Sequence, residues 1–225
     1  DVNVFVSQPD EKTLLERVPG LRTAIVPNGV DVEYFTPTHG KDAPALIYTG
    51  GMNMFANRDA VMFFLDEIWP LIRKQVPDVR FFAVGQDPPK ELLDMAVRDP
   101  QITVTGYVTD VRPLVSEASV YVVPLRVGGG TRLKVLDAMA MGKAMVSTSI
   151  GCEGLAVHPD EHLLVADTPE QFANKTVLLL GDKNCRLALG RAARELVERR
   201  YSWRTIGGQL LDAYRIAIEQ RGRKR

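Results

Sequence analysis

The chain has 225 residues, of which 45% are hydrophobic and 25% charged, and its net charge is zero. These fractions are typical of globular domains and exclude a disordered chain, while the balanced charge argues against nucleic-acid binding. The longest apolar run, Ala60 to Leu65, is too short to span a bilayer. The two cysteines and three histidines form neither a disulfide framework nor a zinc-binding pattern, so we expect a reducing, cytoplasmic compartment and no metal.

The balanced net charge conceals an asymmetry along the chain. Residues 182–225 carry an excess of seven positive charges and residues 1–181 an excess of seven negative ones. Basic residues dominate the last five positions, Arg221 to Arg225. This tail is either a solvated terminus or a contact for an anionic surface, such as the inner face of a membrane or a partner domain.

The first 44 residues alternate short apolar and polar segments. In chain order, we expect a strand over 2–6, a helix over 9–17 and a strand over 23–26. The turn-forming residues Pro27-Asn28-Gly29-Val30-Asp31 follow, and the stretch 36–44, rich in Pro and Gly, predicts a linker.

From residue 45 onward, apolar runs alternate regularly with amphipathic stretches. Strands are expected over 45–49, 80–84, 102–105, 120–123, 144–147 and 162–165. The first helix is expected to begin at an Asn57 cap, with Pro70 starting a new turn or kinking it. Further helices are expected over 89–97, 111–118, 131–141 and 169–180, and a pair of helices over 186–220, the second capped by Ser202. This order predicts an α/β fold, a Rossmann-like parallel sheet with helices on both faces, whose ligands lie at the carboxyl ends of the strands.

The most informative segment runs from Gly128 to Gly142. Gly128, Gly129 and Gly130 allow the backbone to approach a ligand closely, and Thr131 suits the N-cap of the helix that follows. The free N–H groups of the first helical turn predict an anion site there. Gly142 suits the end of the same helix.

Charged side chains reinforce this predicted anion site. Arg132 and Lys134 occupy the first turn and are suited to a phosphate, and Asp137 one turn later is suited to sugar hydroxyls. The alternative is a tight turn with two solvated cations. The spacings of the P-loop and of the dinucleotide-binding loop are both absent. The apolar positions expected to face the core are Leu133, Leu136 and Ala140.

Further glycine loops follow three other predicted strands. Backbone N–H groups at Gly50, Gly51 and Gly85 are suited to a phosphate or a sugar. The backbone at Gly106, with Tyr107 and Val108 beside it, is suited to a flat base. Taken singly, each loop is also explained as a tight turn. Tyr107 is also explained as a core residue, and Glu153, in the loop 151–154, as a solvated turn residue. Their shared place at one edge of the sheet favours a common ligand site.

Four segments together resemble the donor-binding half of the GT-B glycosyltransferases, specifically the large retaining family called glycosyl transferases group 1, or family 4. They are Val26-Pro27-Asn28-Gly29-Val30-Asp31, Gly106-Tyr107-Val108-Thr109-Asp110, residues 130–142 and Tyr201-Ser202-Trp203. The resemblance implies that residues 1–40 are the end of an amino-terminal acceptor domain, of which a remnant is present here. It further implies that residues 41–200 are the nucleotide-sugar domain and 201–225 a returning helix with the basic tail.

Site roles follow from the resemblance residue by residue. The family has two Glu residues separated by seven others; the second corresponds to Asp137, expected to bind donor ribose hydroxyls, and the first falls on Gly129, which has no side chain. Met52 to Met54 occupy the stretch where the family places an Arg and a Lys. The resemblance therefore leaves Arg132 and Lys134 to stabilise the diphosphate.

We accordingly expect a donor-binding part of a retaining glycosyltransferase that uses a nucleoside diphosphate sugar and a hydroxyl acceptor. No cofactor and no metal are expected, and the fragment alone is expected to be inactive. The expected partners are the donor, the missing acceptor domain and a possible membrane surface, with no nucleic acid. The alternatives are a sugar-nucleotide epimerase of the same fold and a non-catalytic module that binds a nucleotide or anion.

Overall fold

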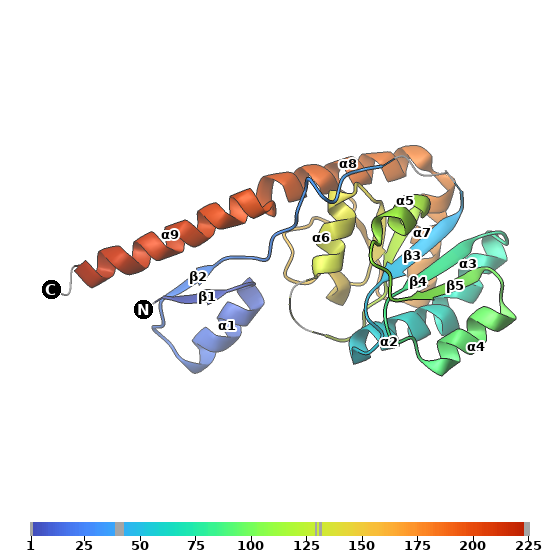
Figure 1. Ribbon diagram of the computed structural model, residues 1–225, viewed down its shortest axis with the longest axis horizontal. Coiled ribbons are helices and arrows are strands. Elements are labelled where there is room, and N and C mark those ends of the chain that lie inside the picture. Colours follow the sequence, from blue (N-terminus) through green and yellow to red (C-terminus); the bar gives the residue numbers. More distant parts are fainter. Residues whose placement is uncertain (1, 39–42, 129, 131, 223–225) are drawn as a thin grey trace.

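The computed structural model describes residues 2–38, 43–128, 130 and 132–222. Figure 1 shows an α/β body, a small amino-terminal unit beside it and a long carboxyl-terminal helix that projects past that unit. The small unit consists of β1 (Asn3–Phe5), α1 (Gln8–Arg17) and β2 (Thr23–Ile25), and its two strands pair in parallel. Ser7 caps α1 by accepting a hydrogen bond from the Asp10 N–H, which satisfies one of the free donors of the first turn.

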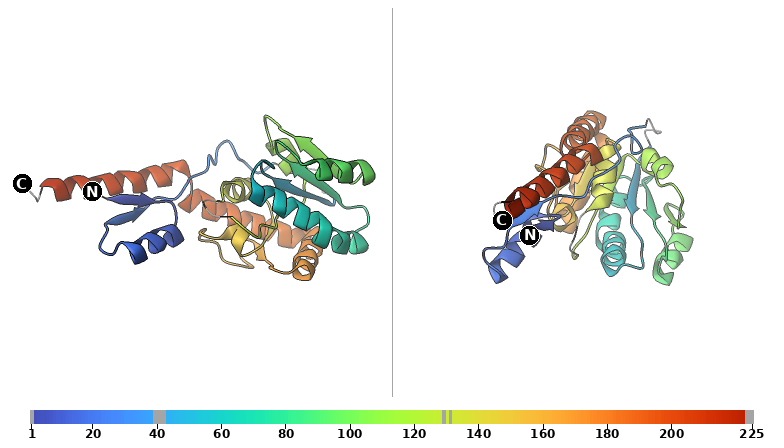
Figure 2. Two further views of the ribbon diagram at one scale, coloured as in Figure 1. Left: turned by 90° about the horizontal axis from the view of Figure 1, so that it is seen from below. Right: turned by 60° about the vertical axis from the view of Figure 1, so that its left-hand side comes forward.

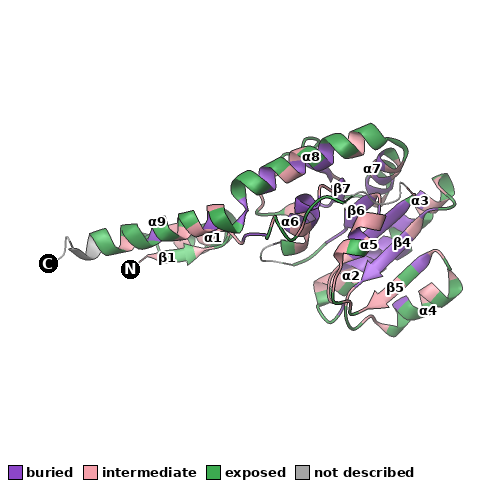
Figure 3. Cartoon of the chain, turned by 45° about the horizontal axis from the view of Figure 1, so that its top comes forward, coloured by how far each residue is buried: buried purple, intermediate pink, exposed green. Residues whose placement is uncertain are grey.

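The body contains a six-stranded sheet in which every pairing is parallel. Its strands are β3 (Ala45–Thr49), β4 (Arg80–Val84), β5 (Ile102–Gly106), β6 (Val120–Val123), β7 (Met145–Ser147) and β8 (Leu164–Val165), and their order is β5-β4-β3-β6-β7-β8. The central strands are almost fully buried, as Figure 3 shows, because helices cover both faces. The sequence prediction of a Rossmann-like parallel sheet is therefore confirmed.

Helices connect the strands and pack on the sheet, as Figures 1 and 2 show. The helical elements are α2 (Phe55–Phe63), η1 (Phe64–Ile68), α3 (Trp69–Gln75), α4 (Lys90–Arg98), α5 (Arg112–Glu117), α6 (Leu133–Ala140), η2 (Ile150–Cys152), α7 (Pro169–Gly181), α8 (Lys183–Arg200) and α9 (Trp203–Gly222). The chain moves one way from β3 to β5 and the other way from β6 to β8, so right-handed crossovers put the connecting helices on opposite faces.

The first long helix differs from its prediction at its start and agrees with it at Pro70. It begins at Phe55, and Met54 is its N-cap, so Asn57 lies inside the helix and does not cap it. As predicted, a new helix, α3, begins here, at Trp69, with Pro70 in its first turn. The turn before it is a wider π-helical one, η1, in which the Trp69 N–H bonds to the Phe64 carbonyl. A proline ring cannot fit against the preceding turn of a regular helix, and the wider turn accommodates it.

The carboxyl-terminal helix packs on the small amino-terminal unit. Val26, Ile206 and Ala213 form a separate buried cluster, and Ser202 caps α9 as predicted, because its hydroxyl accepts from the Thr205 N–H. The last two helices also carry apolar side chains on their surface: Leu187, Leu211, Tyr214 and Ile218 are exposed. The predicted basic tail consists of residues that lie beyond the described part of the chain or whose side chains are not described. No helix in the described part of the chain is long and apolar enough to cross a membrane.

Candidate functional site

The strand order defines a topological switch point between β3 and β6. The chain leaves β3 toward β4 and leaves β6 toward β7, on opposite sides, so the loops after these two strands diverge. In an open parallel sheet such a divergence leaves a crevice at the carboxyl edge, which is the usual ligand position. The loop after β3 carries Gly50 and Gly51, and the loop after β6 leads to α6.

Glycines bring the neighbouring loops into direct backbone contact at this edge. The Gly50 N–H donates to the Val84 carbonyl at 2.8 Å, and the Gly85 N–H donates to the Gly106 carbonyl at 3.2 Å. A Cβ atom on Gly85 would lie 1.9 Å from the Gly50 carbonyl oxygen. Only a residue without a side chain permits this approach, so Gly85 fixes the position of the Gly50 loop.

Lys134 reaches from α6 to the Gly50 loop. Its Nζ donates to the Tyr48 hydroxyl at 2.7 Å and to Oδ1 of Asn57 at 2.6 Å, and a Cβ atom on Gly50 would lie 2.5 Å from the same Nζ. Asn57 also accepts from the Tyr48 hydroxyl and donates to the Gly51 carbonyl. The predicted cation and the predicted glycine loop therefore meet at the switch point through a hydrogen-bonded cluster.

Burial shifts the acid–base behaviour of this cluster. Burial, aided by the nearby Arg132 charge, lowers the pKa of Lys134 to about 7. Burial likewise raises the pKa of the Tyr48 hydroxyl. An anion placed beside this lysine would raise its pKa again, because a nearby negative charge favours the ammonium form.

Asp137 lies one turn further along α6 and is half-buried. Burial raises the pKa of its carboxyl to about 6. The pKa of Tyr121 is raised chiefly by burial and to a lesser extent by the Asp137 charge. Its carboxylate accepts no hydrogen bond within the described part of the chain. A desolvated carboxylate without a donor is destabilising, and hydroxyl groups of a ligand would supply the missing donors.

Arg132 has a different environment from the one expected. It is 6% exposed, and its guanidinium donates to the carbonyls of Gly128 at 2.9 Å and Ile150 at 3.0 Å. Nη2 lies 3.8 Å from a carboxylate oxygen of Glu153. Arg132 therefore braces the loop before α6 against the loop after β7, and it brings positive charge to the site from within the protein.

The start of α6 corrects two further predictions. The residue at the N-cap is Arg132, with no side-chain cap, whereas Thr131 was expected there; Thr131 and Gly129 lie outside the described residues. Leu133 is half exposed, so it does not face the core as expected, while Leu136 and Ala140 do. Gly142 ends the helix as predicted, with a φ of +65°.

The Gly106 turn lies two strands from β3, roughly 10 Å away at the usual strand spacing. Tyr107 is 72% exposed, so it is not a core residue, and Val108 packs partly against the core. Glu153 is exposed, as expected. An exposed aromatic ring at the carboxyl edge leaves a base-stacking surface open.

Sequence reasoning missed the polar partners of Lys134. Tyr48 is the fourth residue of an apolar strand and gave no sign that its hydroxyl would serve the site, and Asn57 was interpreted as a helix cap. Thr49 and Tyr121 form a second hydroxyl pair across β3 and β6, also unpredicted. A polar atom inside an otherwise apolar strand is the signal that could have indicated these residues. The described residues contain no group of His, Cys, Asp and Glu that could hold a metal.

Comparison with known proteins identifies relatives along most of the chain. The family model described as "Glycosyl transferases group 1" matches residues 43–182. A GDP-mannose-dependent alpha-(1-6)-phosphatidylinositol monomannoside mannosyltransferase of Mycobacterium tuberculosis is 26% identical over 241 aligned residues, which cover 96% of this chain and 62% of the relative.

Solved structures share the fold. Sucrose-phosphate synthase from Thermosynechococcus elongatus matches with a TM-score of 0.79 at 23% identity, over 98% of this chain and 59% of that one. Anabaena HepE in complex with UDP and glucose matches with a TM-score of 0.77 at 16% identity, over 94% and 62%. The chain thus spans about three fifths of the length of each of these three proteins.

Proposed function

The chain belongs to the glycosyl transferases group 1, and from that premise we propose that it forms the donor-binding part of a glycosyltransferase that acts with retention of configuration. The donor would be a nucleoside diphosphate sugar and the acceptor a hydroxyl group. In this proposal residues 1–40 end the acceptor domain, residues 41–200 bind the donor, and residues 201–225 return toward the acceptor domain.

One observation carries the proposal: the Lys134 ammonium lies against the Gly50 loop at the switch point. A diphosphate that lay between this ammonium and the start of α6 would meet a full charge and free backbone N–H groups together. The Asp137 carboxylate accepts no hydrogen bond from the described residues, so the ribose hydroxyls of a donor could supply one. Two relatives support the donor class, because one is named as GDP-mannose-dependent and another was solved with UDP and glucose.

The proposed mechanism is electrostatic. When the glycosidic bond to the donor breaks, the leaving diphosphate gains negative charge, and Lys134, Arg132 and the first turn of α6 stabilise it. Loss of one such donor in a closed site typically costs about 3–4 kcal/mol of transition-state stabilisation. Because two cations and a helix terminus supply the positive charge, the proposal assigns no role to a metal.

Calorimetric titration with UDP, GDP, UDP-glucose and GDP-mannose tests donor binding directly. We expect one of these nucleotides to bind the folded chain at a single site, and the Lys134→Met variant to lose affinity. Lys74→Met removes a lysine from an exposed position on α3 and is the matched control, which should bind as the unchanged chain does. If none of the nucleotides binds at millimolar concentration to a folded sample, the proposal is wrong.

The two alternatives make different predictions for the full-length protein. An epimerase of the same fold would convert the donor sugar without an acceptor, which product analysis detects. A non-catalytic module, favoured by the missing carboxylate at Gly129, would bind the donor and never turn it over. The chain of 225 residues by itself is proposed to be inactive, so sugar release above background from it would contradict that part of the proposal.

A further inference from the structure

The stretch of backbone that leads from β6 to α6 contains Arg126 and the predicted glycine loop. Gly128 and Gly130 have φ angles of +121° and +80°, which glycine adopts readily and other residues rarely do. Many conformations are open to such a backbone, so contacts with the rest of the fold must select one of them. The Arg132 guanidinium supplies one such contact, because it donates to the Gly128 carbonyl at 2.9 Å.

Arg126 supplies a second contact, on the other side of Gly128. Its Nη2 and Nε donate to the two carboxylate oxygens of Asp59 at 2.6 and 3.1 Å, and its guanidinium carbon lies 4.3 Å from the centre of the Phe63 ring. The Asp59 side chain is only 17% exposed, and Phe63 is buried. Two parallel hydrogen bonds and an aromatic face together fix the direction of a guanidinium, unlike a single-point surface ion pair, which contributes little.

One face of α2 receives this part of the chain. Ala56, Asp59 and Phe63 follow the i, i+3, i+7 spacing of a single helical face. Asp59 and Phe63 hold Arg126, and a Cβ atom on Gly128 would lie 3.3 Å from the Ala56 Cβ. This face of α2 therefore supports the residues from Arg126 to Gly128 along their length.

These contacts form a continuous series across the proposed donor site. Arg126 is held on α2 and precedes Gly128 by two residues, Gly128 accepts from Arg132, and Arg132 is the N-cap residue of α6. The same helix α2 also holds Lys134, through Asn57. Both cations that the proposed function assigns to the diphosphate are therefore positioned against one helix.

Arg126 itself does not bring a free positive charge to the site. Asp59 carries the opposite charge at hydrogen-bonding distance, and the hydrogen bond between them raises the pKa of Arg126. Because the two charges lie so close together, their effects on a more distant anion largely cancel. An effect of Arg126 on a bound anion must therefore come from the position that it gives to the backbone.

We propose that Arg126 is a positioning residue of the donor site. Paired with Asp59, it fixes the backbone at Gly128, and through Gly128 and Arg132 it fixes the start of α6, where the proposed diphosphate is bound. The identity of the ligand rests on the proposed function, whereas the positioning is a property of the chain itself.

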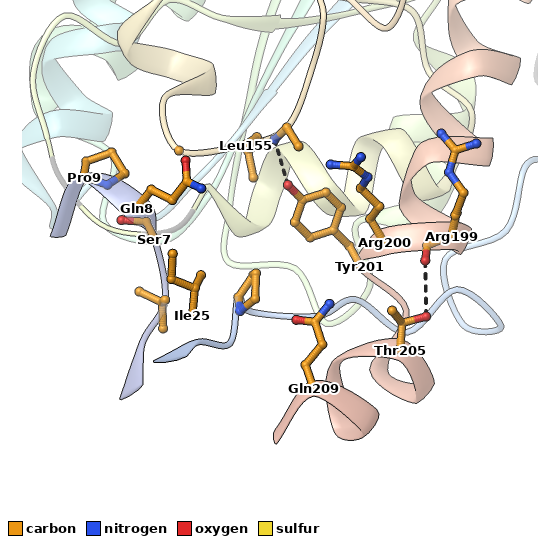
Figure 4. A pocket seen from close by; sticks show the side chains of 14 residues that line it. Ser7, Gln8, Pro9, Ile25, Leu155, Arg199, Arg200, Tyr201, Thr205 and Gln209 are labelled. Atoms are coloured by element: carbon orange, nitrogen blue, oxygen red, sulfur yellow. Dashed lines mark hydrogen bonds between the residues drawn. The ribbon is translucent and has the colours of Figure 1, made fainter. Parts of the chain in front are cut away.

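The pair lies apart from the cavity at the opposite end of the body. That cavity, of about 730 Å³, lies between the start of α1 and the junction of α8 with α9 (Figure 4), and neither Arg126 nor Asp59 lines it. Substitution of the pair therefore leaves the walls of this cavity unchanged.

Calorimetry with UDP and GDP separates the effect of position from that of charge. Arg126→Lys keeps the charge but loses the paired hydrogen bonds and the planar stacking. We expect it to bind the nucleotide that the unchanged chain binds about tenfold more weakly, equivalent to about 1.4 kcal/mol. Retained affinity in Arg126→Lys would overturn the assignment.

Asp59→Asn provides the opposite charge change. The substitution removes a negative charge, so a purely electrostatic role of the pair predicts tighter nucleotide binding, whereas a positioning role predicts weaker binding. The double variant should bind no more weakly than Arg126→Lys alone, because both substitutions break the same contact. Tighter binding by Asp59→Asn, or additive losses in the double variant, would overturn the assignment.

A matched control is another arginine that pairs with an aspartate and stacks on a ring. Arg73 donates to Asp99 at 2.6 Å, and its guanidinium carbon lies 5.5 Å from the centre of the Trp69 ring. Asp99 precedes β5, at the edge of the sheet opposite the glycine loops. Arg73→Lys should therefore lower the free energy of unfolding to a similar degree and leave nucleotide affinity unchanged. An equal loss of affinity in the two lysine variants would overturn the assignment.

Hydrogen exchange tests the positioning without a nucleotide. The Val135 and Leu136 amides in the first turn of α6 donate to the Arg132 carbonyl at 2.9 and 3.3 Å. We expect both single variants of the pair to speed the exchange of these amides several-fold, and the control to leave it unchanged. Unchanged exchange in the variants of the pair contradicts the positioning role, even where nucleotides bind. Faster exchange together with no nucleotide binding to the unchanged chain contradicts the proposed function alone.

Discussion

Nζ of Lys134 lies 2.6 Å from Oδ1 of Asn57, and this contact joins the first turn of α6 to α2 across the switch point. Asn57 receives a second hydrogen bond from Tyr48 and holds the Gly51 carbonyl with its own amide. One side chain thus positions both the cation and the loop between which the proposed diphosphate would lie.

Asn57→Ala should therefore weaken both stability and nucleotide binding. The substitution removes partners from a half-buried ammonium and a buried hydroxyl, which typically costs about 1–3 kcal/mol of unfolding free energy. Urea denaturation measures the first effect and calorimetry the second. Asn174→Ala, at an exposed position on α7, is the control and should change neither quantity. An Asn57 variant as stable as the control would show that the cluster does not hold the two helices together.

Lys134 makes both stability and nucleotide binding depend on pH. Its pKa is lowered from 10.5 to about 7, so between these values the unfolded chain binds the additional proton and the free energy of unfolding rises with pH. Lys143, with its pKa lowered to about 8, contributes in the same direction. Lys134→Met should therefore reduce this slope without abolishing it, as denaturation between pH 7 and 10 would show.

Binding of a diphosphate beside Lys134 should restore its ammonium form. At pH 8 we expect proton uptake on nucleotide binding, seen as a binding enthalpy that varies with the ionisation enthalpy of the buffer. Lys134→Met should remove this component and leave only the titration of the nucleotide itself. Buffer-independent enthalpies for the unchanged chain would place the diphosphate elsewhere.

Asp137→Asn should stabilise the chain and weaken donor binding. The folded carboxyl has a raised pKa of about 6, against 3.8 for the ordinary group, so stability falls as pH rises through this window and the charged form is destabilising above it. The amide variant should gain about 1–2 kcal/mol at pH 7, allowing for partial solvent screening, and nothing at pH 4. Thermal denaturation at both pH values checks the gain, and titration at pH 7 checks the loss of affinity.

Gly85→Ala should be severely destabilising, because its Cβ would lie 1.9 Å from the Gly50 carbonyl oxygen. The backbone of two strands would have to separate, and we expect a loss of more than about 3 kcal/mol, beyond the effect of most substitutions. Gly106→Ala meets no atom within 4 Å but has a φ of +66°, so we expect a cost of about 1–2 kcal/mol. Equal destabilisation of the two variants in urea would contradict the loop contact.

The positions of the strands and of most helices followed from local patterns, whereas the order of the strands in the sheet came only from the structure. Short apolar runs, separated by amphipathic stretches, predicted all six strands of the body to within two residues at either end. Such runs are a strong signal because a strand in a parallel sheet covered on both faces is apolar along its whole length. Helix starts were harder to predict. Asn57 and Thr131 both have side chains that suit a cap, yet the N-caps are Met54 and Arg132, where packing rather than capping chemistry sets the first turn.

The sequence by itself determined the parallel α/β architecture, because strand and helix periodicity is a property of short segments. It also predicted a ligand at the carboxyl edge and Arg132, Lys134 and Asp137 as the charged groups there, and these remain predictions. Only the tertiary structure decided that Tyr48 and Asn57 hold Lys134, that Arg132 turns to the carbonyls of two loops, and that Arg126 pairs with Asp59. Those contacts join residues far apart in the chain, and the direction of a long side chain is set by whichever partners the fold brings within hydrogen-bonding distance.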